Sequence, residues 1–249
     1  AVLCGCATSR PELAQVRALA AGTDALNAFS ELSQRHVDTY RRARPYLSPT
    51  EDARERLLDA QRRSAQADVA RLAQAVRLYL QALGRLAQDD AYDVQPELTS
   101  AGAAIRAWPG SGIEDRHVSA YTLLLQQLAR LAGATSQQAH LAQVLHDGDA
   151  PLQALLAALD SLLALYDKSG DNERDMVLGL LDVEIAYADT PQQRLLAVLA
   201  KNMQQSKTEE YRLLGLRHTL ARRQLAALAR EHAQLAAALT TTEARWTDR

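Results

Sequence analysis

The chain has 249 residues with 28 basic and 30 acidic side chains, and its formal net charge of −2 gives no global field that would attract nucleic acid or an anionic surface. A chain of this length buries a core as one large or two smaller domains without needing disulfides or metals. Aromatic residues make up only 4% of the sequence, Gly and Pro number 11 and 7, and Ala and Leu dominate. Since no segment alternates apolar and polar residues convincingly, the composition predicts an all-α protein, an elongated multi-helix bundle.

Both cysteines lie near the N-terminus, in the run Leu3-Cys4-Gly5-Cys6. Because no other Cys occurs, disulfides do not staple the fold, and a zinc site would lack nearby ligands. The run resembles a bacterial lipobox, in which a Leu precedes the lipid-bearing cysteine by three places and a small residue precedes it directly. The resemblance implies that residues 1–5 are the end of a signal peptide and that Cys6 carries the lipid, with residues 6–9 as a short tether.

The lipobox resemblance also implies where the protein resides. A lipid on Cys6 would anchor the chain in a membrane on the periplasmic side of the bacterial cell envelope. Ala7 follows the cysteine, which resembles the pattern of lipoproteins sorted to the outer membrane. We therefore expect an outer-membrane lipoprotein whose body lies in the periplasm.

Capping boxes predict where the helices begin, since Ser or Thr accepts a first-turn amide while Glu or Gln three residues later reaches back. Residues 9–12 predict a first helix that runs to about Arg44, where a proline ends it. Residues 48–51 predict a second helix to about Asp89. Within residues 10–107 we expect these two to form a long antiparallel hairpin, followed by a short helix from about Val94.

The second predicted helix carries apolar residues spaced alternately four and three places apart, which is typical of a coiled-coil seam. The seam residues are Ala65, Val69, Leu72, Val76, Tyr79, Leu83 and Leu86. We expect the seam to pack on the first helix. The alternative is that it receives a helix from a partner protein.

Residues 108–239 are expected to form a helical bundle packed on the hairpin, as one continuous domain. The turn at 108–112 is the candidate boundary if there are two subdomains, and Ser111 with Glu114 would open the next helix.

Stop signals at 147–149 and 169–172 predict two further helix ends in this bundle. A capping box at 190–193 opens the last helix, with an interruption near 206–209 and a frayed tail at 240–249.

Few residues suggest a catalytic or metal-binding site. Glu114 and His117 have the spacing that places a carboxylate and an imidazole on one helix face, as in di-iron bundles, but the sequence lacks the second such pair. Asp160 interrupts the most apolar stretch, 150–166, and we interpret it as part of a narrow polar strip on that helix. No sequence motif of a hydrolase or a phosphate-binding loop occurs, so we predict no catalysis, metal ion, cofactor or small-molecule substrate.

The pattern predicts a non-catalytic, membrane-tethered helical lipoprotein that binds another envelope protein, as a scaffold or adaptor. Arg41, Arg42 and Arg44 lie at the far tip of the predicted hairpin and form a candidate partner surface. Two alternatives stay open: a periplasmic immunity lipoprotein that neutralises a toxin, and an envelope enzyme or its accessory subunit.

Overall fold

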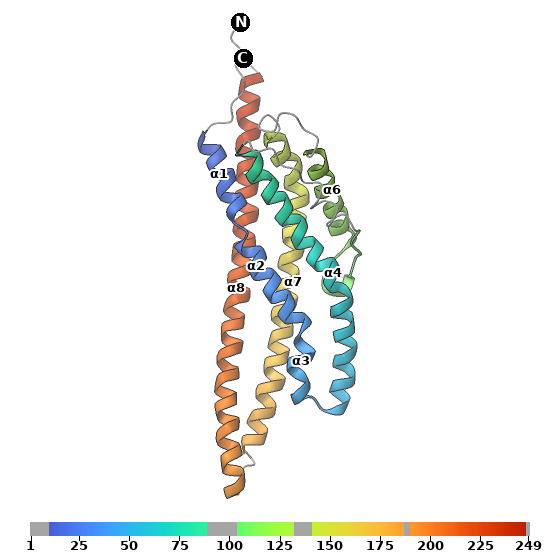
Figure 1. The fold of residues 1–249 in the computed structure, drawn as a ribbon, viewed down its shortest axis with the longest axis vertical. Helices are drawn as coiled ribbons and strands as arrows, with labels where there is room; N and C mark the ends of the chain where they lie inside the picture. The colour runs from blue at the N-terminus through green and yellow to red at the C-terminus, as the bar shows by residue number, and fades with distance from the viewer. Residues whose placement is uncertain (1–9, 89–103, 132–140, 187–189, 248–249) are drawn as a thin grey trace. The chain divides into compact units, whose positions relative to one another are not determined.

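The computed structural model describes residues 10–88, 104–131, 141–186 and 190–247. Within these ranges the chain is helical almost throughout and has no strand, which confirms the all-α prediction. The helices are α1 (Arg10–Ala21), α2 (Asp24–Val37), α3 (Thr39–Ala43), α4 (Pro49–Leu86), α6 (Asp115–Leu131), α7 (Leu141–Ala186) and α8 (Pro191–Thr247), with 3-10 turns η1 (Arg44–Tyr46) and η2 (Pro109–Ser111) (Figure 1). Residues 1–9, with the predicted lipid-bearing Cys6, lie outside the described residues.

The contacts within the chain divide it into two compact units. Unit 1 consists of Ala1–Asn27, Asp68–Ser161 and Arg223–Arg249, and unit 2 consists of Ala28–Ala67 and Leu162–Arg222. Helices α4, α7 and α8 each supply one part to each unit. Both units therefore combine segments from the two sides of the turn at 108–112, where the sequence suggested a boundary.

Two of the predicted capping boxes are present. At the start of α4, the backbone amide of Glu51 donates to the Ser48 hydroxyl at 3.4 Å, and the Ser48 amide donates to the Glu51 carboxylate at 2.9 Å. At the start of α8, Thr190 and Gln193 make the same exchange at 3.3 and 2.9 Å. These two helices begin where the sequence predicted because a capping box depends only on residues three places apart.

The prediction of a single first helix was wrong, because the chain forms α1, α2 and α3 in its place. A turn follows α1, in which the amide of Gly22 donates to the Leu19 carbonyl at 3.0 Å. The carbonyl of Thr23 then accepts the first amides of α2. Gly and Thr both have low helix propensity, so a break here costs little. A second break follows at Asp38, which is the one residue between the end of α2 and the start of α3.

In α7 and α8 the predictions were wrong in the opposite sense. The sequence predicted interruptions, and both helices are continuous. Helix α7 runs through 147–149 and 169–172, and α8 runs through 206–209 and on into the predicted frayed tail as far as Thr247. Two of the three glycines in α7, Gly148 and Gly170, permit close packing and do not end the helix. The Tyr79 hydroxyl lies against Gly148, and the Leu214 side chain lies against Gly170.

Unit 1 packs α1 and α6 with parts of α4, α7 and α8. The α4 seam from Val69 to Leu86 is buried, and a Cβ built on Gly84 would lie only 2.9 Å from the Cβ of Ala20 in α1. Gly84 lies beside the seam and not in it, so this contact places α1 against α4 without placing it on the seam. The seam residue Tyr79 contacts Gly148 of α7 and His232 of α8. From α7, Leu152, Leu155 and Leu159 are fully buried as well.

A loop precedes α6 in unit 1. The described residues 104–107 are not helical, which contradicts that part of the predicted short helix, and the rest of it lies outside the described residues. The amide of Trp108 donates to the Ile113 carbonyl at 2.7 Å across a turn in which Gly112 has a φ of 83°. The Trp108 indole donates to the buried carboxylate of Asp68 at 2.8 Å and fixes the loop to α4.

Unit 2 consists of α3, η1, most of α2, the first part of α4, the second part of α7 and the first part of α8. Helices α7 and α8 form an antiparallel hairpin whose tip extends past the turn between α3 and α4 (Figure 1). The Gln204 side chain of α8 donates to Asp182 of α7 near this tip. Leu32, Leu163 and Val177 lie in the core of the unit.

Helix α7 is the one described helix that is long and apolar enough to cross a membrane by length and composition. Half of its most apolar window of 18 residues is buried inside the chain. A core helix passes the same test, and this burial agrees with the expectation that the stretch 150–166 lies inside the bundle.

Candidate functional site

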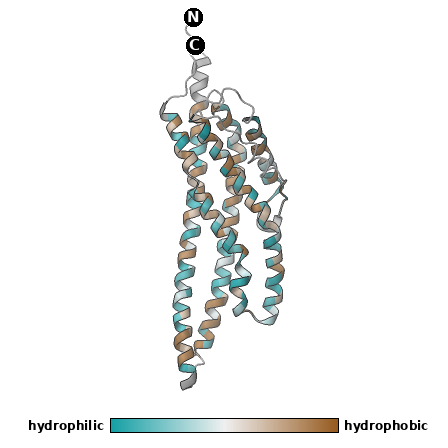
Figure 2. Cartoon of the chain, in the orientation of Figure 1, coloured by the Kyte–Doolittle hydropathy of each residue, from teal (hydrophilic) through white to brown (hydrophobic). Residues whose placement is uncertain are grey.

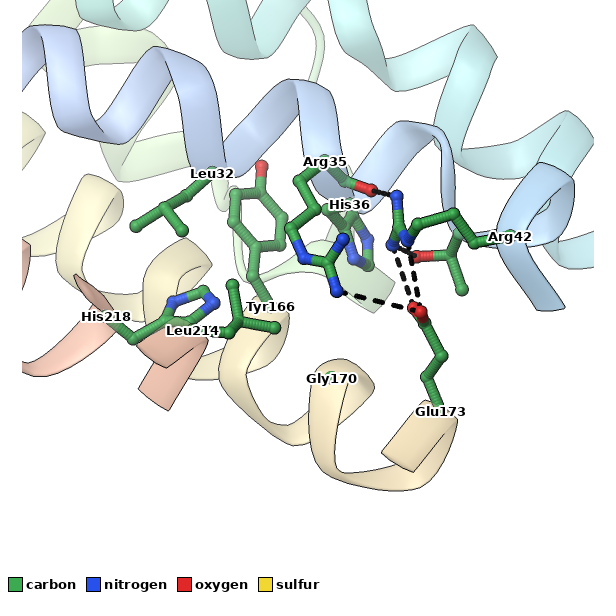
Figure 3. Close-up of a pocket in the computed structure, with 10 residues that line it drawn as sticks. Leu32, Arg35, His36, Arg42, Tyr166, Gly170, Glu173, Leu214 and His218 are labelled. Atoms are coloured by element: carbon green, nitrogen blue, oxygen red, sulfur yellow. Dashed lines mark hydrogen bonds and ion pairs between the residues drawn. The ribbon is translucent and has the colours of Figure 1, made fainter. Parts of the chain in front are cut away.

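A buried ionic network lies inside unit 2, between α2 and α3 on one side and α7 on the other (Figure 3). Its centre is Glu173 of α7, whose side chain is only 3% exposed. Arg42 of α3 donates to both Glu173 carboxylate oxygens, at 3.0 and 2.8 Å, in the bidentate geometry that planar guanidinium favours. Arg35 of α2 lies 3.8 Å from the same carboxylate. The buried negative charge therefore faces two positive charges.

The network continues onto α8. The Tyr211 hydroxyl donates to Glu173 at 3.2 Å, and burial, followed by the nearby Glu173 carboxylate, raises the pKa of this phenol. Arg35 donates to Glu210 at 2.9 Å, and Lys207 donates to the other oxygen of Glu210 at 2.8 Å. Together these contacts fasten α2, α3, α7 and α8 to one another by charge-assisted hydrogen bonds.

A small cavity of about 10 Å³ lies beside the network and has room for one water molecule but not for a substrate. Two histidines line it, and each has a buried Nδ1 with no hydrogen-bond partner, His36 on α2 and His218 on α8 (Figure 3). The His36 ring stacks on Tyr166 with the ring centroids 4.3 Å apart. Desolvation lowers the pKa of both imidazoles, and for His36 to about 3.

The His36 imidazole makes unit 2 sensitive to acid. Burial is the main cause of its low pKa, and Arg62, Arg42 and His218 lower it further, whereas an unfolded His takes up a proton near pH 6.5. As the pH falls from 6.5 towards about 3, the unfolded chain therefore binds more protons than the folded chain. The free energy of unfolding should fall by on the order of 1 kcal/mol per pH unit from this group.

Replacing His36 with Phe should reduce this acid sensitivity, because Phe keeps the stacking on Tyr166 and takes up no proton. The check is urea unfolding at about pH 4.5 and about pH 7, with the expectation that the variant loses less stability on acidification than the parent. The control is His146→Phe, since the His146 side chain is 65% exposed and the substitution should leave the pH dependence unchanged. An identical pH dependence in the His36 variant and the parent would contradict this account.

A second buried hydrogen-bond chain lies in unit 1. His232 of α8 lies 2.8 Å from Asp149 through Nδ1 and 2.8 Å from the Tyr79 hydroxyl through Nε2. Burial lowers the pKa of His232, and the contact with Asp149 acts in the opposite direction. The Tyr79 hydroxyl has one proton and lies near two acceptors, His232 Nε2 at 2.8 Å and the Val144 carbonyl at 3.2 Å. Tyr79 and His232 are each 0% exposed, whereas the Asp149 side chain is 32% exposed, so solvent reaches only the Asp149 end of this chain of groups.

The arginines predicted as a partner surface separate into two kinds. Arg41 and Arg44 are exposed, the Arg41 side chain to 77%. Arg42 instead turns inward to Glu173, and it also donates to the backbone carbonyl of Arg35 at 2.7 Å. Arg42 therefore belongs to the interior of unit 2, and only the other two are accessible to a partner.

The other residues singled out from the sequence have local roles. The imidazole Nδ1 of His117 accepts the backbone amide of Glu114 at 3.0 Å, so His117 caps the start of α6 and the expected box from Ser111 does not form. Glu114 itself pairs with Arg116. Asp160 is partly exposed on α7. Within the ranges that the structure describes, no three His, Cys, Asp or Glu side chains gather in a way that could hold a metal ion.

Exposed apolar side chains are concentrated in the α7 and α8 segments of unit 2. Figure 2 shows hydrophobic residues on both helices towards the hairpin tip. The large exposed ones are Leu180, Val183, Leu195, Leu196, Val198, Leu199, Met203, Leu213, Leu216 and Leu220. The sequence did contain the spacing of the α8 leucines, but nothing in it distinguished their exposed face from the buried one.

Searches against protein-family models, curated proteins and solved structures found no match to the chain.

Proposed function

We propose that this chain is a non-catalytic, lipid-anchored helical protein that binds another envelope protein, as a scaffold or adaptor. In this proposal the lipid on Cys6 holds the chain on the periplasmic side of the envelope, with the outer membrane favoured. The observation that carries the binding role is the concentration of exposed apolar side chains on α7 and α8 of unit 2. Single exposed apolar residues are ordinary, whereas a gathering of them marks a binding surface.

The hairpin tip explains why these side chains are available. Two helices bury one apolar stripe each against the other, so apolar residues on their remaining faces need a further element to cover them. Val183 of α7 is 54% exposed and Leu196 of α8 is 64% exposed. Arg41 and Arg44 add positive charge on the same unit, which favours a partner that presents apolar residues together with carboxylates.

The test is affinity purification of the lipidated chain, tagged at its C-terminus, from the solubilised membrane fraction. We expect one stoichiometric envelope protein to accompany the parent chain and to be lost in a Val183→Glu, Leu196→Glu variant. Leu57→Glu is the matched control, because Leu57 is 70% exposed and belongs to α4, not to α7 or α8. The control should retain the partner.

The proposed lipid anchor on Cys6 is tested by fractionating the same cells. Cys6→Ser should move the chain from the membrane fraction to the soluble fraction. A Cys6→Ser chain that stays in the membrane fraction would refute the anchor. Recovery of the parent chain alone after mild crosslinking would refute the partner. Deletion of the chain that kills or sickens cells only beside a toxin-producing neighbour would favour the immunity role.

A further inference from the structure

Helix α8 carries a second apolar row on the side that unit 2 does not use. We call the α8 row the eight positions spaced alternately four and three places apart along one face. They are Leu195, Leu199, Asn202, Ser206, Glu209, Leu213, Leu216 and Leu220, and all are exposed. The five leucines are 49% to 66% exposed. This spacing is that of a coiled-coil seam, and from first to last position it extends about 37 Å.

The opposite side of the same helix segment is already packed. Tyr211, Leu214 and His218 are buried, and Tyr211 reaches the Glu173 network. The α8 row therefore cannot turn inward, since a rotation of the helix would expose these groups and break their contacts. Leucines at five of eight seam positions require a helical partner to remove them from water.

We propose that the α8 row binds the α8 row of a second copy of this chain in antiparallel orientation. The row is close to self-complementary when reversed. Leu195 faces Leu220 of the second copy, and Leu199 faces Leu216. At the centre, Ser206 faces Glu209, where its hydroxyl donates to the carboxylate. The row thus satisfies the requirement of a two-fold interface that the same surface fits itself.

The charges beside the row support the same orientation. In this register Glu209 faces Ser206, Arg212 faces Met203 and Arg217 faces Val198 of the second copy, so no two like charges are opposed. A parallel pair would set Glu209 against its own copy at the centre of the seam, whereas Arg217 is already paired with Glu31 of its own chain. Like charges in such positions destabilise a coiled coil, so the charge pattern selects the antiparallel pair.

The polar middle of the row also fixes the register. Moving the second copy by one heptad in the direction that brings Glu209 opposite Leu213 would bury a carboxylate against an apolar side chain and leave Leu195 without a partner. The proposed register has one kind of polar to apolar pairing, Asn202 with Leu213, which the two-fold symmetry makes twice. Polar residues within a seam are known to select register and orientation in this way.

The first test is the mass of the purified full chain in which Cys4 and Cys6 are replaced by Ser, measured by light scattering. We expect twice the 27.2 kDa of the single chain. Leu199→Glu with Leu216→Glu should weaken the association by at least about 100-fold, because a two-fold interface buries each new carboxylate twice. Leu57→Glu should leave the dimer intact, and circular dichroism should show the same helix content in all three chains.

The second test determines the orientation by disulfide formation. In the same background, a mixture of Leu199→Cys and Leu216→Cys chains should form the mixed disulfide, and neither chain should crosslink to itself. A single chain at about 100 µM, a dimer that survives the two Glu substitutions, or a crosslink between two Leu199→Cys chains would each overturn the proposal. So would capture of a monomer by phosphatidylglycerol vesicles through these leucines.

This inference does not rest on the proposed function, because the dimer forms from the purified chain alone. If the chain is a monomer and the envelope partner is still recovered through Val183 and Leu196, only the dimer is wrong. If the dimer forms and no envelope partner is recovered, only the proposed function is wrong.

Discussion

Replacing Gly148 with Ala is expected to lower the free energy of unfolding by about 3 kcal/mol. A Cβ at this position would lie 2.3 Å from the Tyr79 hydroxyl oxygen and 2.6 Å from the ring carbon that bears it. Both distances are far below van der Waals contact, and the Tyr79 ring is fully buried. The ring must therefore move, and its hydroxyl then loses its contacts with His232 Nε2 and with the Val144 carbonyl.

Whether Gly148→Ala stabilises or destabilises the fold depends on the relative size of three free-energy contributions. Alanine is the better helix former by about 1 kcal/mol, which favours the substitution inside α7. Overpacking costs roughly 1 to 3 kcal/mol, and leaving His232 and Asp149 with a broken chain of hydrogen bonds costs a further 1 to 3, roughly. The packing and polar costs together exceed the gain in propensity.

The measurement is chemical unfolding of parent and variant under identical conditions. Gly179→Ala is the matched control, because Gly179 also lies in α7 and a Cβ there would meet nothing within 4 Å. The control should be stabilised by up to about 1 kcal/mol. If both variants are stabilised alike, Tyr79 is not held against Gly148 in the manner described.

Removing the Glu173 carboxylate should cost about 3 to 5 kcal/mol, as expected for breaking a buried ion pair by deleting one partner. Glu173→Ala would leave Arg42 half-buried with neither of its two carboxylate bonds. It would also remove the acceptor of the Tyr211 hydroxyl. Glu184→Ala is the control, because Glu184 lies on the same helix and is exposed.

A double substitution separates the charge effect from the packing effect. Glu173→Leu with Arg42→Met replaces the pair by apolar side chains of similar volume, which is often neutral for buried ion pairs. We expect the double variant to be more stable than the sum of the two single losses predicts, with a coupling of about 1 to 3 kcal/mol. Strictly additive losses in unfolding experiments would show that the two side chains do not act as a pair.

Local patterns in the sequence determined the all-α fold, the α4 seam and the starts of α4 and α8. Each depends on residues within one or two helical turns. The Ser48 and Thr190 caps each reach only three residues along the chain, so their chemistry is visible without coordinates. The same local reasoning failed at Gly148 and Gly170, where it predicted ends of helices.

Tertiary structure alone decided what those glycines do. The side chains that need the space, Tyr79 and Leu214, are distant in sequence and come close only when the helices pack. Arg42 and Glu173 are 131 residues apart, and no spacing rule connects them, so an arginine predicted at the surface turned out to pair with a buried carboxylate. Hydrophobic periodicity shows that a helix has an apolar face, but which of two faces is covered depends on where other helices lie. In α8 the covered face is the one that carries Tyr211, Leu214 and His218. The α8 row therefore faces solvent.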